Sequence, residues 1–124
     1  KAEAELILYD AHYGWNDPTR RQLSERAQLA GVKLEARIEV EHVEAALKLV
    51  ARGVGDTFVS RAVTQGLSFP AGVGTVPFAE PLFDTVALVQ RESTVLSPAT
   101  REIARLAREM LLSRRRRDAA TAGA

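Results

Sequence analysis

The sequence predicts an α/β domain with a Rossmann-like parallel sheet and helices on its faces. Short apolar runs of strand length alternate along the chain with segments whose apolar residues recur at helical spacing. Glycine and proline separate most of these segments, as expected for turns. Strands that alternate with helices in this way form parallel sheets joined by right-handed crossovers. The 124 residues, 46% hydrophobic and 27% charged, suffice for one globular domain with its own core.

The first three predicted elements are a strand, a helix and a second strand. Residues 6–9 are an apolar run that predicts a buried strand. Asp17–Pro18 supplies a cap and a first-turn proline for a helix over residues 18–30, which Gly31 ends in a left-handed conformation. Over residues 33–40, apolar and charged side chains alternate. This period of two predicts a half-buried strand near a sheet edge.

The remaining elements follow from the same kinds of signal. They are a helix over 43–50 that ends at Gly53, a strand at 57–59, a loop over 66–74, a strand at 76–78, an inner strand at 86–89 and a helix over 97–112. Ser97 and Pro98 supply the cap of the last helix. Residues 113–124 are charged and then small, with nothing to bury, so we expect a disordered basic tail.

Composition excludes several classes of protein. There is no cysteine, which excludes disulfides, thiolate metal sites and cysteine nucleophiles. No apolar stretch approaches the ~20 residues that span a bilayer, so no membrane partner is expected. The formal net charge of +1 argues against a surface devoted to nucleic acid. The arginine run at 114–117 could touch phosphate, although a cationic end also suits a helix C-terminus.

The motifs of catalysis, phosphate binding and metal binding are missing. The glycines at 53–55 and 72–74 do not follow a strand and open a helix, as a phosphate loop does. No serine stands in a Gly-x-Ser-x-Gly elbow, and no carboxylate pair accompanies a nucleophile. His12 and His42 lack the spacing of a metal-binding motif, which predicts two surface imidazoles. We therefore expect no enzyme activity, no metal and no cofactor.

Ligands of open α/β sheets bind beyond the carboxyl ends of the strands. Three such ends can be named, at residues 12–16, 41–42 and 60–61. Tyr13 and Trp15 could stack on an organic ligand there, while Asn16 and the free amides of the next helix turn hold a carboxylate. The alternative interpretation is that Trp15 covers the end of the sheet and binds nothing.

Several motifs, taken in order, are similar to those of one family. Leu6-Ile7-Leu8-Tyr9-Asp10 precedes a helix from Pro18, and Glu39-Val40-Glu41 enters a helix that ends in Leu49-Val50-Ala51-Arg52-Gly53-Val54-Gly55. The run Val86-Ala87-Leu88-Val89 and the segment Leu96-Ser97-Pro98-Ala99 then lead into a long helix. This arrangement over residues 5–112 resembles the effector-binding domain of LysR-type transcriptional regulators. Each motif is loose, but their order and spacing together are specific.

The resemblance implies the fold of type 2 periplasmic solute-binding proteins, in which two α/β lobes close on a small molecule. Residues 1–112 would be a partial effector-binding domain, with 5–81 as the second lobe and 82–112 as the strand and helix that return to the first. The family's winged helix-turn-helix and most of its first lobe are not in these 124 residues, so DNA would be reached only through that N-terminal domain. Because the sequence starts at Lys1, we expect it to come from a longer protein.

The family's cleft positions fall on the same three strand ends. The matching residues are Tyr13, Gly14, Trp15, Asn16, Glu41, His42, Val43, Ser60 and Arg61. The implied ligand is a small organic effector, which we expect to be an acid. Two departures lie at the third segment, where Asp56 replaces an apolar strand residue and Ser60 replaces a proline. The resemblance also implies a bacterial, cytoplasmic protein that regulates transcription.

Two alternatives keep this fold and change its role. The chain could be a fragment of an extracytoplasmic solute-binding protein, or it could act mainly as an association module. In LysR-type proteins, helix 18–30 and strand 33–40 form the dimer face, so we expect a homo-oligomer through these segments. The apolar run at 86–89 should either join the domain's own sheet or swap into another copy.

Overall fold

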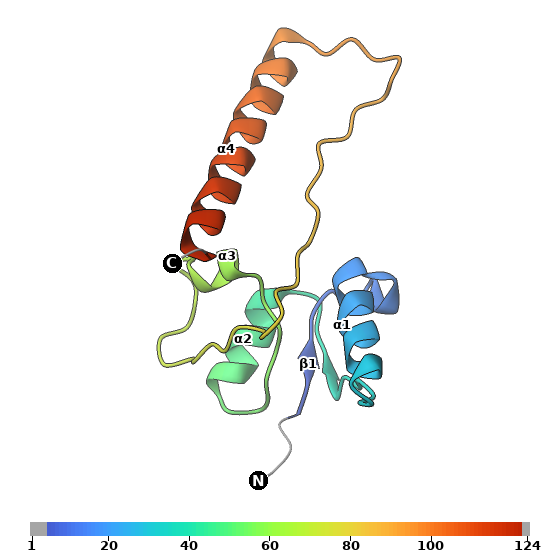
Figure 1. Ribbon diagram of the computed structural model, residues 1–124, viewed down its shortest axis with the longest axis vertical. Helices are drawn as coiled ribbons and strands as arrows, with labels where there is room; N and C mark the ends of the chain where they lie inside the picture. Colours follow the sequence, from blue (N-terminus) through green and yellow to red (C-terminus); the bar gives the residue numbers. More distant parts are fainter. Residues whose placement is uncertain (1–4, 123–124) are drawn as a thin grey trace. The chain divides into compact units, whose positions relative to one another are not determined.

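The computed structural model describes residues 5–122, and its contacts divide the chain into two units, with the division between Asp84 and Thr85 (Figure 1). The first unit contains β1 (Ile7–Leu8), η1 (Gly14–Asn16), α1 (Pro18–Leu29), β2 (Ile38–Glu39), α2 (Val43–Ala51) and α3 (Arg61–Thr64). The second unit contains α4 (Pro98–Ala122).

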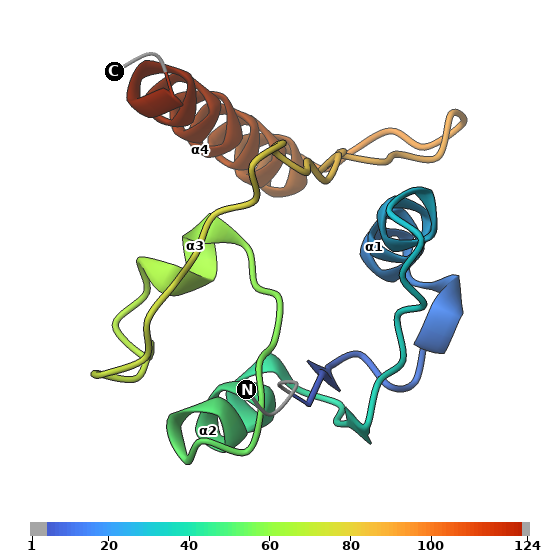
Figure 2. The same cartoon turned by 60° about the horizontal axis from the view of Figure 1, so that its bottom comes forward.

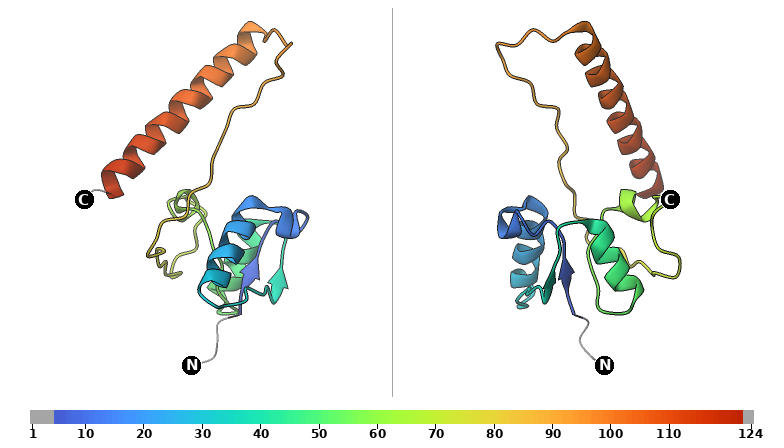
Figure 3. Two further views of the ribbon diagram at one scale, coloured as in Figure 1. Left: turned by 45° about the vertical axis from the view of Figure 1, so that its right-hand side comes forward. Right: turned by 180° about the vertical axis from the view of Figure 1, so that it is seen from behind.

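A short parallel strand pair forms the centre of the first unit. β1 and β2 pair in parallel, with Ile7 opposite Ile38 (Figure 3). On its other edge β1 forms an isolated parallel bridge between Leu6 and Asp56, and the Thr57 hydroxyl donates to the Ile7 carbonyl at 2.7 Å. β1 therefore lies between two parallel neighbours, in the order expected when successive crossovers place the next strands on either side of the first.

The segment at 33–40 shows the predicted alternation in burial but only part of the predicted strand. Leu34, Ala36, Ile38 and Val40 are half-buried, while the charged residues between them are exposed. Only Ile38–Glu39 is strand; the Arg37 amide still donates to the Leu6 carbonyl at 2.9 Å, but residues 33–36 make no backbone hydrogen bond with another strand in the described part of the chain. The predicted strand was therefore too long. Side-chain alternation indicates which face is covered, but a strand also needs a neighbour for its backbone.

Local capping signals set the helix bounds as predicted. The Asp17 carboxylate accepts from the Arg20 amide at 2.9 Å, and proline occupies the first turn of α1. Gly31 follows α1 with φ of 72°, and Gly53 follows α2 with φ of 73°, the left-handed conformation that glycine adopts without strain. These predictions are confirmed. In Figure 2 the strand pair lies between α1 and α2, so each helix can cover a different face.

The core of the first unit is small and gathers around β1. Its buried apolar residues are Ile7, Leu8, Leu23, Ala46 and Leu47. They come from β1, α1 and α2, with Leu23 contributed by α1 and Ala46 and Leu47 contributed by α2. One charged residue, Arg20, is buried among them with 3% of its surface exposed.

The second unit is a long helix preceded by an irregular segment. The Ser97 hydroxyl accepts from the Thr100 amide at 3.2 Å, which confirms the predicted cap of α4. α4 then continues to Ala122, whereas the sequence predicted a disordered tail from residue 113. No glycine or proline interrupts residues 113–122, and alanine and arginine favour helix, so the helix continues. Residues 123–124 lie outside the described part. No helix within that part is long and apolar enough to cross a membrane.

Three predicted strands do not form among the described residues. Residues 57–59, 76–78 and 86–89 belong to no strand. The last of these is also not buried as predicted, since Val86, Leu88 and Val89 are 70%, 55% and 93% exposed. An apolar run becomes a strand only beside a neighbour that accepts its backbone hydrogen bonds. Within the described residues of the second unit, the run at 86–89 has no such neighbour.

Candidate functional site

Two of the three predicted site segments are joined by hydrogen bonds at the carboxyl end of the strand pair. The Asp10 amide donates to the Glu41 carbonyl at 3.1 Å, and the Ala11 amide donates to the Val40 carbonyl at 3.1 Å. The Glu41 carboxylate accepts from the His12 amide at 3.0 Å. These bonds bring residues 10–16 and 41–43 together, and we call this pair of segments the rim.

The rim holds its aromatic residues in a tight turn. Asp10 has φ of 58°, an uncommon value for a residue other than glycine, and its carbonyl accepts from the amides of Tyr13 and Gly14. Gly14 has φ of 52° and starts η1. Tyr13 and Trp15 are therefore left 61% and 43% exposed. Tyr13 is the more exposed of the two rings, and Arg20 lies over the Trp15 ring.

The rest of the predicted rim residues lie around this turn. Asn16 is the exposed last residue of η1. His42 precedes α2, its imidazole is exposed, and its carbonyl accepts from the Ala45 amide at 3.0 Å. Val43 is the half-buried first residue of α2. The rim thus combines exposed polar side chains with the exposed rings of the turn.

Arg20 fixes the rim to the strands. Its guanidinium donates to the Tyr9 carbonyl at 3.1 Å and to the Glu39 carboxylate at 2.8 Å, and it lies 5.9 Å from the centroid of the Trp15 ring. These contacts tie η1 to the ends of both strands. The sequence analysis missed Arg20, although a signal was present. Arg20 stands three positions before Leu23, on the face of the helix that was predicted to be buried.

The electrostatic environment beneath the rim is acidic. Burial, and next the carboxylate of Asp10, raise the pKa of Tyr9 above its usual value. Asp17 and Asp84 act in the same direction, while Arg20 partly opposes them. A negative field and partial desolvation both disfavour a tyrosinate. Tyr9 is therefore neutral at physiological pH and can offer an uncharged hydroxyl.

The amides that the sequence analysis assigned to a carboxylate are largely occupied. In the first turn of α1, Pro18 has no N–H, the Arg20 amide donates to the Asp17 side chain, and the Arg21 amide donates to the Asp17 carbonyl. The helix cap is already a carboxylate, so a second anion would be repelled there. The expectation that these amides hold a ligand carboxylate is wrong, because the amides of Arg20 and Arg21 already donate to Asp17.

The third predicted segment is not joined to the rim by any hydrogen bond or ion pair among the described residues. Ser60 precedes α3 and Arg61 is its first residue, whereas the sequence predicted the end of a strand. Both side chains are exposed. In Figure 1 α3 lies at the end toward which β1 points, the end that also carries η1 and the start of α2. Hydrogen bonds thus join the first two predicted segments, but none joins the third to them among the described residues.

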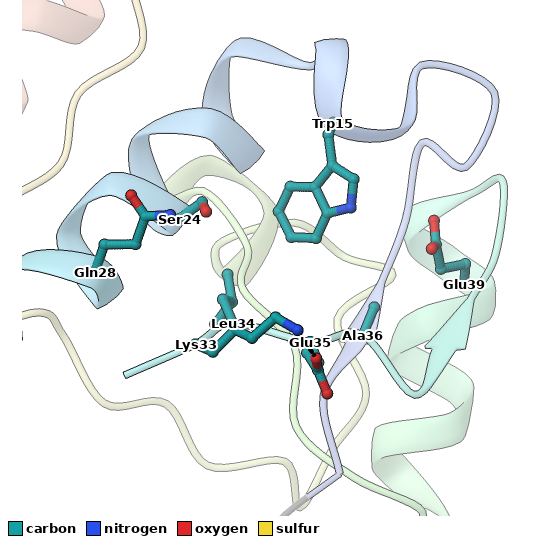
Figure 4. A pocket seen from close by; sticks show the side chains of 8 residues that line it. All are labelled: Trp15, Ser24, Gln28, Lys33, Leu34, Glu35, Ala36 and Glu39. Carbon is teal, nitrogen blue, oxygen red and sulfur yellow. Dashed lines mark ion pairs between the residues drawn. The ribbon is translucent and has the colours of Figure 1, made fainter. Parts of the chain in front are cut away.

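The larger hollow of the first unit lies away from most rim residues. It is an open groove of about 480 Å³ between α1 and residues 33–39, and Figure 4 shows the Trp15 indole pointing into it. It is lined by Trp15, Ser24, Gln28, Lys33, Leu34, Glu35, Ala36 and Glu39. Its walls are the two segments that the resemblance assigned to association. Trp15 is the one residue that the groove shares with the predicted site.

A second hollow lies at the carboxyl end of β1 but is small. Its volume is about 40 Å³, enough for one or two water molecules rather than an organic effector. It is lined by Leu8, Tyr9, Asp10, Asp17, Thr19, Arg20, Leu23 and Phe58. This hollow and the rim lie at strand ends, the place where open α/β sheets bind ligands.

Comparison with known proteins gives one match. A family model described as the LysR substrate binding domain matches residues 2–112. No curated protein and no solved structure matches the chain. The match covers the strand pair, the rim and the first part of α4, and it ends before the arginine run at 114–117.

Proposed function

Since the chain belongs to the LysR substrate binding domain family, we propose that it is the effector-sensing part of a LysR-type transcriptional regulator. Domains of this family belong to transcription regulators and have a periplasmic-binding-protein-like α/β fold. In our proposal, residues 5–81 form a Rossmann-like second lobe and residues 82–112 return to the first lobe. The parent protein is cytoplasmic, is not an enzyme, and recognises specific DNA through its winged helix-turn-helix.

The observation that carries this proposal is the hydrogen-bonded rim. The bond from the His12 amide to the Glu41 carboxylate sets the aromatic turn beside the start of α2. Tyr13 and Trp15 would stack on the effector, and Glu41 and His42 would bind its polar groups. Ser60 and Arg61 would close the site from the start of α3. An organic acid remains our prediction, with Arg61 as the cation that holds its carboxylate, since the amides of the α1 turn are occupied.

A matched set of three small molecules tests the site and its charge preference. We expect phenylacetate to quench the fluorescence of Trp15, the only tryptophan of the chain, more strongly than phenethylamine or 2-phenylethanol. All three stack equally well and differ in charge. Affinity should be weak, with a dissociation constant of about 1 mM or above, because one lobe supplies few contacts to offset association entropy.

The control for this titration is a pair of arginine substitutions. Arg61→Gln should abolish the preference for phenylacetate, while Arg52→Gln, an exposed arginine after α2, should leave it unchanged. An equal response to all three molecules would contradict the prediction that the effector is an organic acid. No response to any of them would contradict a stacking site at the rim.

A second role as an association module is favoured by the groove. Residues 33–36 make no backbone hydrogen bond with another strand in the described part of the chain, and they line the open groove beside α1. An open edge of this kind is a site at which another chain can pair. We propose that copies associate through α1 and residues 33–40.

Light scattering tests this association. The average mass at micromolar concentration should exceed the 13.5 kDa of one chain and should fall on dilution. Leu34→Lys should return the mass to that of a monomer, because it places a charge at the centre of the contact. Leu67→Lys, at a fully exposed loop position, is the matched control and should change nothing. A mass of one chain at every concentration would contradict the association.

A further inference from the structure

The arginine run of α4 is the densest charge in the described part of the chain. Residues 114–117 are four consecutive exposed arginines on one helix. A helix rises about 1.5 Å and turns about 100° per residue, so four cations lie within about 5 Å along the axis and face all sides. Arg114, Arg115 and Arg116 have no side-chain hydrogen bond or ion pair with any described residue. Asp118 is the one acidic residue that follows them.

The end of the helix does not account for these charges. Cations stabilise a helix C-terminus through the last turn, and the effect falls off beyond it. α4 continues to Ala122 and has no basic residue in its last turn. The position of the run within α4 therefore gives these arginines no stabilising role at the helix end.

The effector-sensing fold does not account for them either. The family match ends at residue 112, and α4 carries the run beyond that point. No apolar side chain larger than alanine occurs from residue 113 to residue 122, so this part of the helix has nothing to pack against a protein core. Its chemistry is that of an exposed polycation.

The kind of anion follows from what surrounds the run. A helix that lies on an anionic membrane needs a large apolar face beside its cations. The apolar stripe of α4, with Ile103, Leu106 and Met110, ends before the run begins. A guanidinium binds phosphate oxygens through two parallel N–H bonds, and phosphates are spaced regularly along a nucleic-acid duplex. We propose that Arg114–Arg117 bind the phosphate backbone of duplex nucleic acid without reading its sequence.

Fluorescence anisotropy with two labelled duplexes of unrelated sequence tests this proposal. The full chain should bind both equally at low salt, because phosphate contacts carry no sequence information. Because the cations face different sides of α4, we expect one duplex to neutralise about two of them, so log K should fall with log salt with a slope of about −1.8, which is about 12-fold between 50 and 200 mM salt.

Two charge-matched variants decide whether the run is responsible. One replaces all four arginines of the run with glutamine. The control replaces four exposed cations elsewhere, as Arg21→Gln, Lys48→Gln, Arg52→Gln and Arg91→Gln, and so changes the net charge equally. The run variant should bind at least about 10-fold more weakly, while the control should lose less than about threefold, since only contacts to phosphate contribute to the slope.

Three outcomes would overturn the proposal. The first is an absence of binding to either duplex at low salt. The second is an equal loss of affinity in both variants, which would show that net charge alone matters. The third is tighter binding to phosphatidylserine vesicles than to duplex, which would assign the run to a membrane surface. Circular dichroism of both variants checks that α4 has remained folded.

Discussion

Arg20→Ala should lower the free energy of unfolding by about 3 kcal/mol, because it removes the buried guanidinium, its ion pair with Glu39 and its bonds to the Tyr9 carbonyl. Arg20 is 3% exposed and contacts Tyr9, Trp15 and Glu39. Its loss leaves the Tyr9 carbonyl without that donor and frees η1 from the strand ends. Denaturant unfolding followed by circular dichroism measures the change.

The neighbouring residue gives a matched control. Arg21 is exposed and makes no side-chain hydrogen bond or ion pair with the described residues, so Arg21→Ala should change stability by less than about 0.5 kcal/mol. Arg20→Lys keeps the charge but not the planar arrangement of N–H donors, so its loss of stability should lie between those of Arg20→Ala and Arg21→Ala. Acrylamide should also quench Trp15 more readily in Arg20→Ala. Equal stability of the Arg20→Ala and Arg21→Ala proteins would show that Arg20 does not anchor the rim.

Gly55→Ala should destabilise the first unit by about 3 kcal/mol through a steric overlap with the backbone, at the upper end of overpacking effects. A Cβ at position 55 would overlap the Glu5 carbonyl oxygen. That carbonyl accepts from the Asp56 amide at 2.9 Å, and the Asp56 carbonyl accepts from the Ile7 amide at 2.9 Å. Backbone at both ends must move to make room, which breaks the parallel bridge beside β1.

Gly74→Ala is the control for this substitution. No atom lies within 4 Å of a Cβ at position 74 and its φ is not positive, so the change should be neutral or stabilising by up to about 1 kcal/mol. Thermal unfolding of the two variants side by side gives the comparison. A Gly55→Ala protein as stable as Gly74→Ala would mean that the close approach of residue 55 to Glu5 does not hold the strands.

Local chemistry made much of the fold predictable. Asp17, Pro18, Gly31 and Gly53 each act within one turn of the chain, and the helix bounds they predicted are confirmed. The alternation at residues 33–40 predicted which side chains are covered. The resemblance of the motifs to LysR-type effector domains is confirmed by the family match over residues 2–112.

Features that depend on distant partners could not be predicted in the same way. The runs at 57–59, 76–78 and 86–89 have strand-like sequences, but a strand requires a neighbour that no local signal specifies. The role of Arg20 required knowing that Tyr9 and Glu39 end beside it. The amides of the α1 turn are occupied because Asp17 caps the helix, and this cap was predicted. Its consequence, that the same amides cannot also bind an anion, was not predicted.

The structure joins the predicted rim segments by hydrogen bonds but does not join Arg61 to them among the described residues. The strand-end rule placed residues 12–16 and 41–42 at one edge, and hydrogen bonds join these segments. Ser60 and Arg61 follow from the same rule, but they begin a helix instead of ending a strand. Their part in a common site with the rim therefore remains a prediction.

We propose that residues 13–16, 41–43 and 60–61 form one effector site. An NMR titration of the isotope-labelled chain with phenylacetate tests this most directly. We expect the amide signals of Trp15, His42 and Arg61 to shift together, with one dissociation constant. Shifts confined to the loop at 66–74, or to residues 33–36 of the groove, would contradict it and would place the ligand elsewhere on the first unit.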